Sequence, residues 1–393
     1  MKKVFILLTL LFILTGCWDY KELNNYSIVT GIAIDKDEND KYEVSVLISN
    51  SPKDSSSTKE SSESNVVVYT GKSSTILGAF KDIGLISPKE IYIGSFSVLI
   101  ISEDIAKEGL NEIVDVFLRY PNSRKSFYIT ITKGDKAKDV LKIMTPLANY
   151  PSQNISDNLS SSTDLQGIIG KVTFNELLSI FVNDGIDPAI NTIHIVGSEK
   201  KGENQSNLKT TEPNTYVKLG TLSIFKNYKL VKHTTYEESM GINFVNNKVD
   251  ETYLKIKHND GYVVVDTSDF KSNSKVKLVD SNPKVVIKVS GNTKIIESSE
   301  NIDLKDSKTI KEMQDKTNKK VKKIINNSIE LAKDYESDVF GFGLKFSREY
   351  PNFFKENEWK EVFKNLDVSI KSNLIIKNEV SSRNSLEEIN DKK

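Results

Sequence analysis

The sequence predicts a multi-domain α+β protein in which β-sheets are packed with helices, behind an N-terminal export signal. Strand-like and helix-like patterns alternate through residues 17–198, which indicates a mixed α/β region. Strand patterns dominate from residue 214 until a long helical pattern begins at residue 308. Apolar residues make up 38% of the chain, and the length after the signal is enough for two or three domains of about 100 to 200 residues each.

The chain begins with a segment typical of a signal peptide, residues 1–16. Lys2 and Lys3 precede an unbroken apolar run at 4–14, which as a helix would span about 17 Å and is too short to cross a hydrocarbon core of about 30 Å. The run ends in Leu-Thr-Gly-Cys, a pattern that resembles the lipobox of bacterial lipoproteins. It predicts cleavage between Gly16 and Cys17 and a lipid-attachment site at Cys17, which would carry S-diacylglycerol and N-acyl groups.

Cys17 is the single cysteine of the sequence, so no structural disulfide is possible and a thiolate-based metal site is not expected. The alternative is an ordinary signal peptide followed by a buried cysteine, which would leave an exported protein with an unpaired thiol. Lipidation removes that thiol, and two or more acyl chains hold a protein on a bilayer where one would not. We therefore expect the membrane as a partner.

Residues 17–198 form the predicted N-terminal mixed α/β region, which comprises one domain or more. Alternating apolar residues predict a hairpin within residues 24–50, which in one interpretation packs on the later part of the chain. A capping box of Thr173 and Glu176 predicts a helix that ends near Gly185. The other expected elements are strands at 66–70, 91–101 and 127–132, helices at 74–85, 103–119, 135–143 and 151–165, and a polar loop at 51–64.

Residues 199–213 are polar and charged, and we interpret them as a linker or loop at the main domain boundary. A β-rich region follows at 214–380, and its long amphipathic helix at 308–335 begins at Asp306 or Ser307 as the cap. The polar tail is residues 381–393. Within the β-rich region we expect strands at 216–225, 229–233, 252–256, 262–265, 276–279, 285–296 and 366–376, and helices at 237–245 and 352–363.

The sequence predicts no catalytic residue, no cofactor and no metal site, and it leaves ligand-binding residues unknown. Basic and acidic residues are balanced at 54 each, which gives no electrostatic footprint for nucleic acid. Thr-Gly-Lys-Ser at 70–73 lacks the first glycine of a phosphate-binding loop, because Val66 stands there. Residues 35–39 start like a calcium loop, but Asp40 and Val46 replace its required glycine and glutamate.

Other chemistry-bearing residues have structural interpretations. His194, His233 and His258 are far apart in sequence and are expected at strand edges or on the surface, and no GxSxG motif occurs. The aromatic residues around Trp359 are expected in a core rather than in a ligand cage. A lysine cluster at 319–323 fits a solvated helix face, or alternatively a contact with anionic lipid.

The mature sequence resembles the Ger(x)C family, the lipoprotein C subunits of bacterial spore germinant receptors. The resemblance starts with Gly-Cys-Trp-Asp at 16–19 and continues into Thr-Gly-Ile-Ala-Ile-Asp at 30–35, although Tyr20 and Lys21 stand where the family usually has a basic pair. Similar motifs follow in order along essentially the whole chain. They lie at 92–94, 117–121, 136–139, 185–188, 219–220, 224–226, 237–239, 338–343 and 350–351.

The resemblance implies three domains, each a β-sheet packed with helices, and a non-enzymatic subunit required for spore germination in response to small nutrients. It implies a lipid-anchored position at the outer face of the spore inner membrane, together with an integral-membrane A subunit and a transporter-like B subunit. The alternative is an extracytoplasmic solute-binding or assembly lipoprotein. A lipid-anchored hydrolase is a third class, but the sequence shows no nucleophile and base pair for it.

Overall fold

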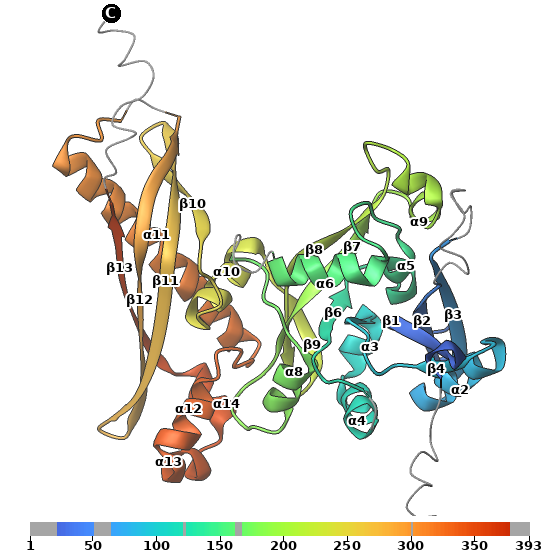
Figure 1. Cartoon of the computed structure of the whole chain (residues 1–393). Coiled ribbons are helices and arrows are strands. Elements are labelled where there is room, and N and C mark those ends of the chain that lie inside the picture. The colour runs from blue at the N-terminus through green and yellow to red at the C-terminus, as the bar shows by residue number, and fades with distance from the viewer. Residues whose placement is uncertain (1–21, 51–63, 121–122, 162–166, 300–301, 378–393) are drawn as a thin grey trace, which may run out of the picture.

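The computed structural model describes residues 22–50, 64–120, 123–161, 167–299 and 302–377, which fold into two β-sheets packed with helices (Figure 1). The predicted α+β class is confirmed, while the number of domains stays a prediction. The signal segment 1–16, Cys17, the loop at 51–63 and the tail 381–393 lie outside the described residues. No helix among the described residues is long and apolar enough to cross a membrane.

The first sheet is mixed, with parallel strands at its centre and antiparallel pairs at both edges. Its order is β3-β2-β1-β5-β6-β7-β8-β9, and the short β4 also pairs with β1. The β1–β2 and β8–β9 hairpins were both predicted and are confirmed. The strands are β1 (Tyr26–Lys36, after the 3-10 turn η1 at Leu23–Asn25), β2 (Tyr42–Ser49), β3 (Val66–Ser73), β4 (Glu90–Tyr92), β5 (Val98–Ile101), β6 (Tyr128–Thr132), β7 (Ala189–Val196), β8 (Tyr216–Lys226) and β9 (Lys229–His233).

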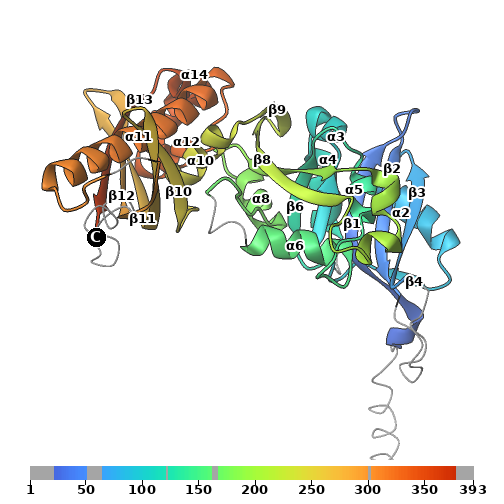
Figure 2. The ribbon, with the colours of Figure 1, turned by 90° about the horizontal axis from the view of Figure 1, so that it is seen from above.

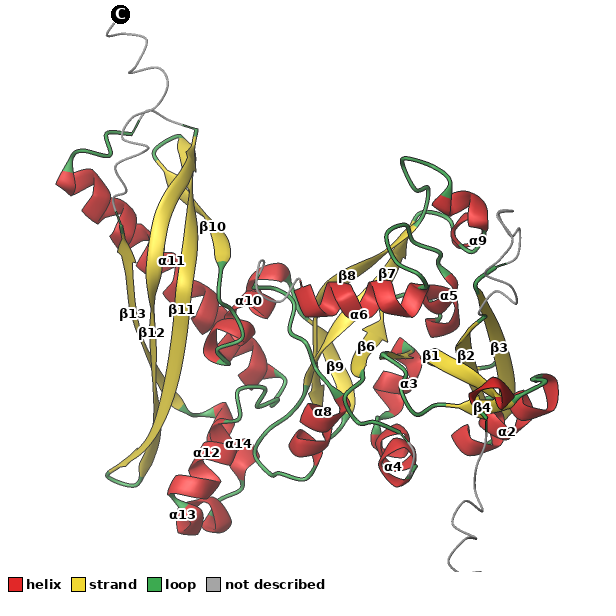
Figure 3. Cartoon of the chain, in the orientation of Figure 1, coloured by secondary structure: helices red, strands yellow, loops and turns green. Residues whose placement is uncertain are grey.

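Helices cover both faces of this sheet, because its central strands are apolar on both sides. One face packs against α2 (Ile76–Ile86), α3 (Glu103–Glu108), α4 (Asn111–Arg119) and α8 (Phe174–Phe181). The other packs against α5 (Ala137–Lys142) and α6 (Pro151–Ser161). Figure 3 shows these helices on either side of the strands. The predicted capping box is present: Thr173 accepts from the Glu176 amide, and Glu176 accepts from the Thr173 amide.

Three predicted elements are each divided in the structure, and one of them is the helix expected at 352–363, which forms two helices over 351–356 and 359–364. The strand expected at 91–101 is two strands, β4 and β5, both parallel to β1. The helix expected at 103–119 is α3 followed by α4, because Gly109 adopts a φ of +136° that no helix can continue. Apolar periodicity alone does not reveal such breaks, since apolar residues are buried both before and after each break.

The segment 199–213 lies within the first sheet and does not separate the two sheets. It contains α9 (Glu199–Gly202) and the 3-10 turn η2 (Gln205–Leu208), and it joins the neighbouring strands β7 and β8. Buried Asn207 explains its order, since its Nδ2 donates to the carbonyls of Met144 at 2.7 Å and Thr215 at 2.8 Å. The segment 199–213 is therefore a structured connection inside the first sheet, and the chain leaves that sheet only after β9. The domain boundary expected at 199–213 stays a prediction.

The second sheet is a long, twisted ribbon with the order β10-β11-β12-β13. Its strands are β10 (Thr252–His258), β11 (Gly261–Val279), β12 (Asn282–Ser298) and β13 (Asp367–Ile376). The two strands predicted at 262–265 and 276–279 are one strand, β11, which continues through a bulge between Ser268 and Lys271. The associated helices are α10 (Tyr236–Val245), α11 (Ser307–Asp334), α12 (Phe342–Glu349), α13 (Pro351–Glu356) and α14 (Trp359–Lys364).

The helix α11 covers one face of the second sheet and confirms the predicted long helix. Asp306 caps it by accepting from the amides of Lys308 and Thr309. Its apolar stripe, including Val321 and Ile324, packs against α10 and the sheet, and the same core includes Leu222 of β8. The two sheets thus meet through shared apolar residues. Figure 2 shows the two sheets from above.

Candidate functional site at the junction of the two sheets

Three segments that are far apart in sequence meet where the two sheets join. They are 185–188, between α8 and β7; 224–226, at the end of β8; and 338–343, which runs from the turn after α11 into the first residues of α12. Their backbones are hydrogen-bonded directly: the Asp187 amide donates to the Asp338 carbonyl at 2.9 Å, and the Leu344 amide donates to the Gly185 carbonyl at 2.9 Å. These segments carry three of the motifs in which the chain resembles the Ger(x)C family.

Asp187 and Gly185 fix the first side of the junction. The Asp187 carboxylate accepts the Asp338 amide at 2.9 Å and lies 3.4 Å from the Lys226 ammonium group. Burial raises the pKa of Asp187, and Lys226 opposes that shift. Gly185 has a φ of +76°, and a Cβ there would lie 2.5 Å from the carbonyl carbon of Gly343, so only glycine fits this contact.

Asp338 organises the second side. Its Oδ1 accepts the amides of Phe340 and Phe342, and its Oδ2 accepts the amide of Gly343 at 2.7 Å and the indole N–H of Trp359 at 3.0 Å. Burial raises the pKa of Asp338 to about 7, although the N–H groups of Gly343, Phe342 and Trp359 act to lower it. The carboxylate thereby holds the start of α12 against α14.

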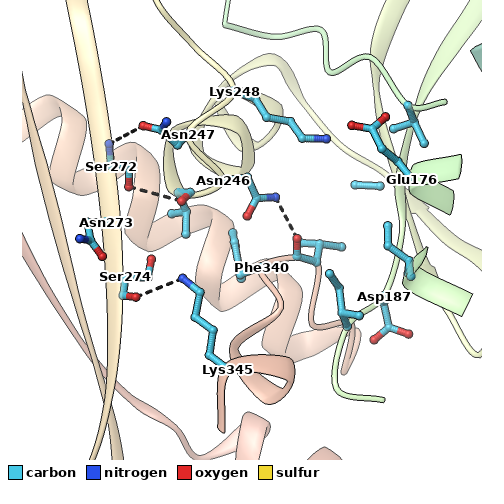
Figure 4. Close-up of a pocket in the computed structure, with 16 residues that line it drawn as sticks. Glu176, Asp187, Asn246, Asn247, Lys248, Ser272, Asn273, Ser274, Phe340 and Lys345 are labelled. Atoms are coloured by element: carbon cyan, nitrogen blue, oxygen red, sulfur yellow. Dashed lines mark hydrogen bonds between the residues drawn. The ribbon is translucent and has the colours of Figure 1, made fainter. Parts of the chain in front are cut away.

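A cavity of about 370 Å³ opens beside this junction, lined by residues from both sheets (Figure 4). Lys248 reaches toward Glu176, and Lys345 donates to the Ser274 carbonyl at 3.1 Å. Burial lowers the pKa of both lysines. No ion pair joins either ammonium group to another described residue. The cavity therefore offers two partly desolvated cations, which suit an anionic or carboxylate-bearing group.

A serine–histidine–glutamate chain occurs on the edge of the first sheet. Ser223 Oγ lies 2.8 Å from His233 Nδ1, and His233 Nε2 lies 3.3 Å from Glu103 Oε1. Ser223 has no exposed surface, because it is a buried cross-strand partner of His233 in the β8–β9 pair. A substrate has no access to this hydroxyl, so the chain of contacts is structural.

The other residues weighed from the sequence have structural roles. Lys72 and Gly71 lie at the end of β3 before α2, and the Asp37 carboxylate accepts the amides of Asn39 and Lys41 in the β1–β2 turn. No cluster of three or more metal-ligating side chains occurs among the described residues. The lysine cluster at 319–323 lies on the solvent side of α11, where Lys320 pairs with Glu237.

The aromatic group around Trp359 is core, as predicted: its neighbours Phe346 and Phe363 are buried. His258 ends the edge strand β10, and His233 lies on the edge strand β9, as predicted. His194 lies on β7, between β6 and β8, and is partly exposed. Lys248, Lys345 and the Asp187–Asp338 link were not predicted. The sequence held one signal that could have indicated this site: the carboxylate of Asp338 stands directly before the apolar and glycine residues of 339–343.

The chain is similar to known spore germination proteins over most of its length. The family described as "Spore germination protein N-terminal domain" matches residues 19–195, and that described as "Spore germination B3/GerAC like, C-terminal" matches residues 220–379. Spore germination protein KC of Bacillus subtilis (strain 168) is 24% identical, over 95% of this chain and 94% of the relative. Spore germination protein GerQC of Bacillus cereus is 20% identical, over 93% of this chain and 95% of the relative.

The fold also matches a solved structure, the crystal structure of the GerBC protein. The TM-score is 0.54 at 15% sequence identity, and the match covers 92% of this chain and 100% of that chain. At this identity the match supports the fold, and the two family matches together cover most of the sequence. The chain therefore belongs to the GerAC-like family of spore germination proteins.

Proposed function

We propose that this protein is a lipid-anchored, non-enzymatic subunit of a nutrient germinant receptor, held at the outer face of the spore inner membrane by Cys17. One observation carries the proposal: the match to the germination family begins at residue 19, directly after the lipobox pattern that ends at Cys17. Receptor A and B subunits are the expected partners. The buried position of Ser223 argues against its hydroxyl as a nucleophile for a substrate.

The decisive variant is Cys17→Ala. It removes the sulfur that would accept the diacylglycerol, so we expect loss of labelling by radioactive palmitate, loss from the membrane fraction and impaired germination in response to nutrients. Thr15→Ser is the matched control, because it alters the same motif and keeps the cysteine. Normal nutrient germination in Cys17→Ala spores would contradict the anchoring proposal.

The partner proposal has its own test, affinity purification of the tagged protein from spore inner membranes. Recovery of an integral-membrane subunit and a transporter-like subunit of a germinant receptor is the expected result. Recovery of an ABC transporter instead would favour a solute-binding lipoprotein, the alternative function.

The cavity at the junction is the observation that favours this alternative. Lys248 and Lys345 place two cations where a carboxylate-bearing solute could lie, in a volume typical of small-molecule sites. Calorimetry with a panel of amino acids and small carboxylates tests it, with Lys345→Met as the site variant and Lys323→Met on α11 as the control. Absence of binding to the wild-type protein would exclude this function for those solutes.

A further inference from the structure

The second sheet has one face that no helix of the described residues covers. Along each strand, alternate residues are buried under α11, such as Leu254, Val265 and Ile287, and the residues between them point to the opposite side. Figures 1 and 2 both show α11 on a single side of the four strands. The opposite face is an open, extended surface built on a rigid sheet.

Lysines are concentrated on this open face, around the β11–β12 hairpin. We define the lysine face by six residues that point away from α11: Lys271, Lys275, Lys277, Lys284, Lys288 and Lys371. All but Lys284 are exposed, and Lys284 is partly exposed. Of these six lysines, Lys284 is the one that forms an ion pair with another described residue, Asp367, at 3.1 Å.

The register places like charges directly opposite one another. Lys277 pairs across the strands with Lys284, and Lys288 pairs with Lys371. Such pairs destabilise a sheet, and neither is needed for packing because both lie on the uncovered side. The whole chain has a formal net charge of zero, so this positive face is a local segregation of charge and not a consequence of composition.

The open face points to the same side of the molecule as the membrane-proximal end of the chain. In Figure 2, α11 lies above the second sheet, while β4 and the beginning of β1 reach toward the bottom of the picture. Residue 22 is five residues after Cys17, so a fully extended link to the lipid would be under about 20 Å. Because the start of β1 and the lysine face lie on the same side of the molecule, one membrane surface can contact both.

We infer that the lysine face binds an anionic lipid bilayer. The second sheet would then lie flat on the same membrane that holds the lipid group of Cys17. The partner is argued from shape and charge: the face is broad and open, and its lysines spread over three adjacent strands, which fits a plane of negative headgroups better than a small anion. Each lysine near such a surface contributes about a five-fold gain in partitioning. The inference rests on the proposed membrane location.

Vesicle binding tests the face without the lipid anchor. The probe protein is the chain from residue 17 with Cys17→Ser, and the vesicles are phosphatidylcholine with or without phosphatidylglycerol. We expect binding only to vesicles with phosphatidylglycerol, and weaker binding at high salt because the charges are exposed. The triple variant Lys275→Gln, Lys277→Gln, Lys288→Gln should bind roughly 100-fold more weakly.

The matched control is Lys311→Gln, Lys319→Gln, Lys322→Gln, which removes the same charge from the exposed side of α11 and should bind as the parent does. Equal losses in the two triple variants, or no binding of the parent to anionic vesicles, would overturn the inference. Unchanged vesicle binding with loss of receptor partners from the sheet variant would assign the face to an acidic protein surface instead. Failure of the Cys17→Ala test would leave these vesicle results unaffected, so the two proposals can fail separately.

Discussion

Asp338 shows how a single buried carboxylate can set the pH response of the junction. Its pKa is raised from 3.8 to about 7, so the folded protein holds a proton there that the unfolded chain has already released above pH 4. The stability present at pH 4 should therefore fall as the pH rises to about 7, by about 1.4 kcal/mol per pH unit from this group.

The variant Asp338→Asn tests this response. The neutral side chain should remove this group's contribution to the pH dependence and so make it shallower, measured as the free energy of unfolding in denaturant between pH 5 and pH 7; the contributions of Asp35 and Asp187, whose pKa values are also raised by burial, remain. The substitution should also lower the free energy of unfolding by about 2 to 4 kcal/mol, because an amide NH₂ replaces one acceptor oxygen among four N–H donors. Asp315→Asn, exposed on α11, is the control. An unchanged slope in the Asp338 variant would show that other groups cause it.

Gly185 permits the close approach of the two sheets. In Gly185→Ala, the added methyl group would clash with the backbone of Gly343. This clash comes in addition to the cost of placing alanine at a positive φ, which is about 1 kcal/mol. Gly134→Ala is a matched control, because Gly134 has a φ of +83° with no atom near its Cβ position. We expect a larger loss of thermal stability for Gly185→Ala. Equal losses would mean that the contact with Gly343 relaxes freely.

At the scale of elements, α5 depends on a cap from a distant strand. The Asp35 carboxylate of β1 accepts the amides of Ala137 and Lys138, each at 2.8 Å, and burial raises its pKa to about 6. Asp35→Ala should cost about 2 kcal/mol and speed hydrogen exchange in α5, since both amides lose their acceptor. Asp157→Ala, exposed on α6, is the control. Unchanged exchange in α5 would show that the helix is held by its apolar face alone.

At the scale of the whole molecule, the two sheets should unfold together. Leu222 and Ile224 of the first sheet belong to the core beneath α11, so separating the sheets would expose apolar surface on both. In a Trp18→Phe background Trp359 is the single tryptophan. Its fluorescence reports the junction, and far-ultraviolet circular dichroism reports the helices and strands. We expect coincident denaturation curves, and two separated transitions would contradict the shared core.

Local sequence determined the elements whose partners are near in the chain. The capping box at Thr173, the cap at Asp306 and the hairpin around Asn227 each depend on residues within a few positions, so periodicity and cap chemistry predicted them. The lipobox was likewise readable as a short motif, and the role of Cys17 stays a prediction. Breaks such as Gly109 were missed because apolar periodicity continues across them.

Tertiary structure alone decided the junction and the charged surfaces. Asp187 and Asp338 are 151 positions apart, and nothing in either local sequence indicates that one carboxylate accepts the other's amide. Lys248 and Lys345 face one cavity, and six lysines share one face, only because strand register and helix packing place them there. The sequence by itself thus determined the class and most elements. Folding brought distant groups together and left one side of the second sheet without a helix from the part of the chain that the structure describes.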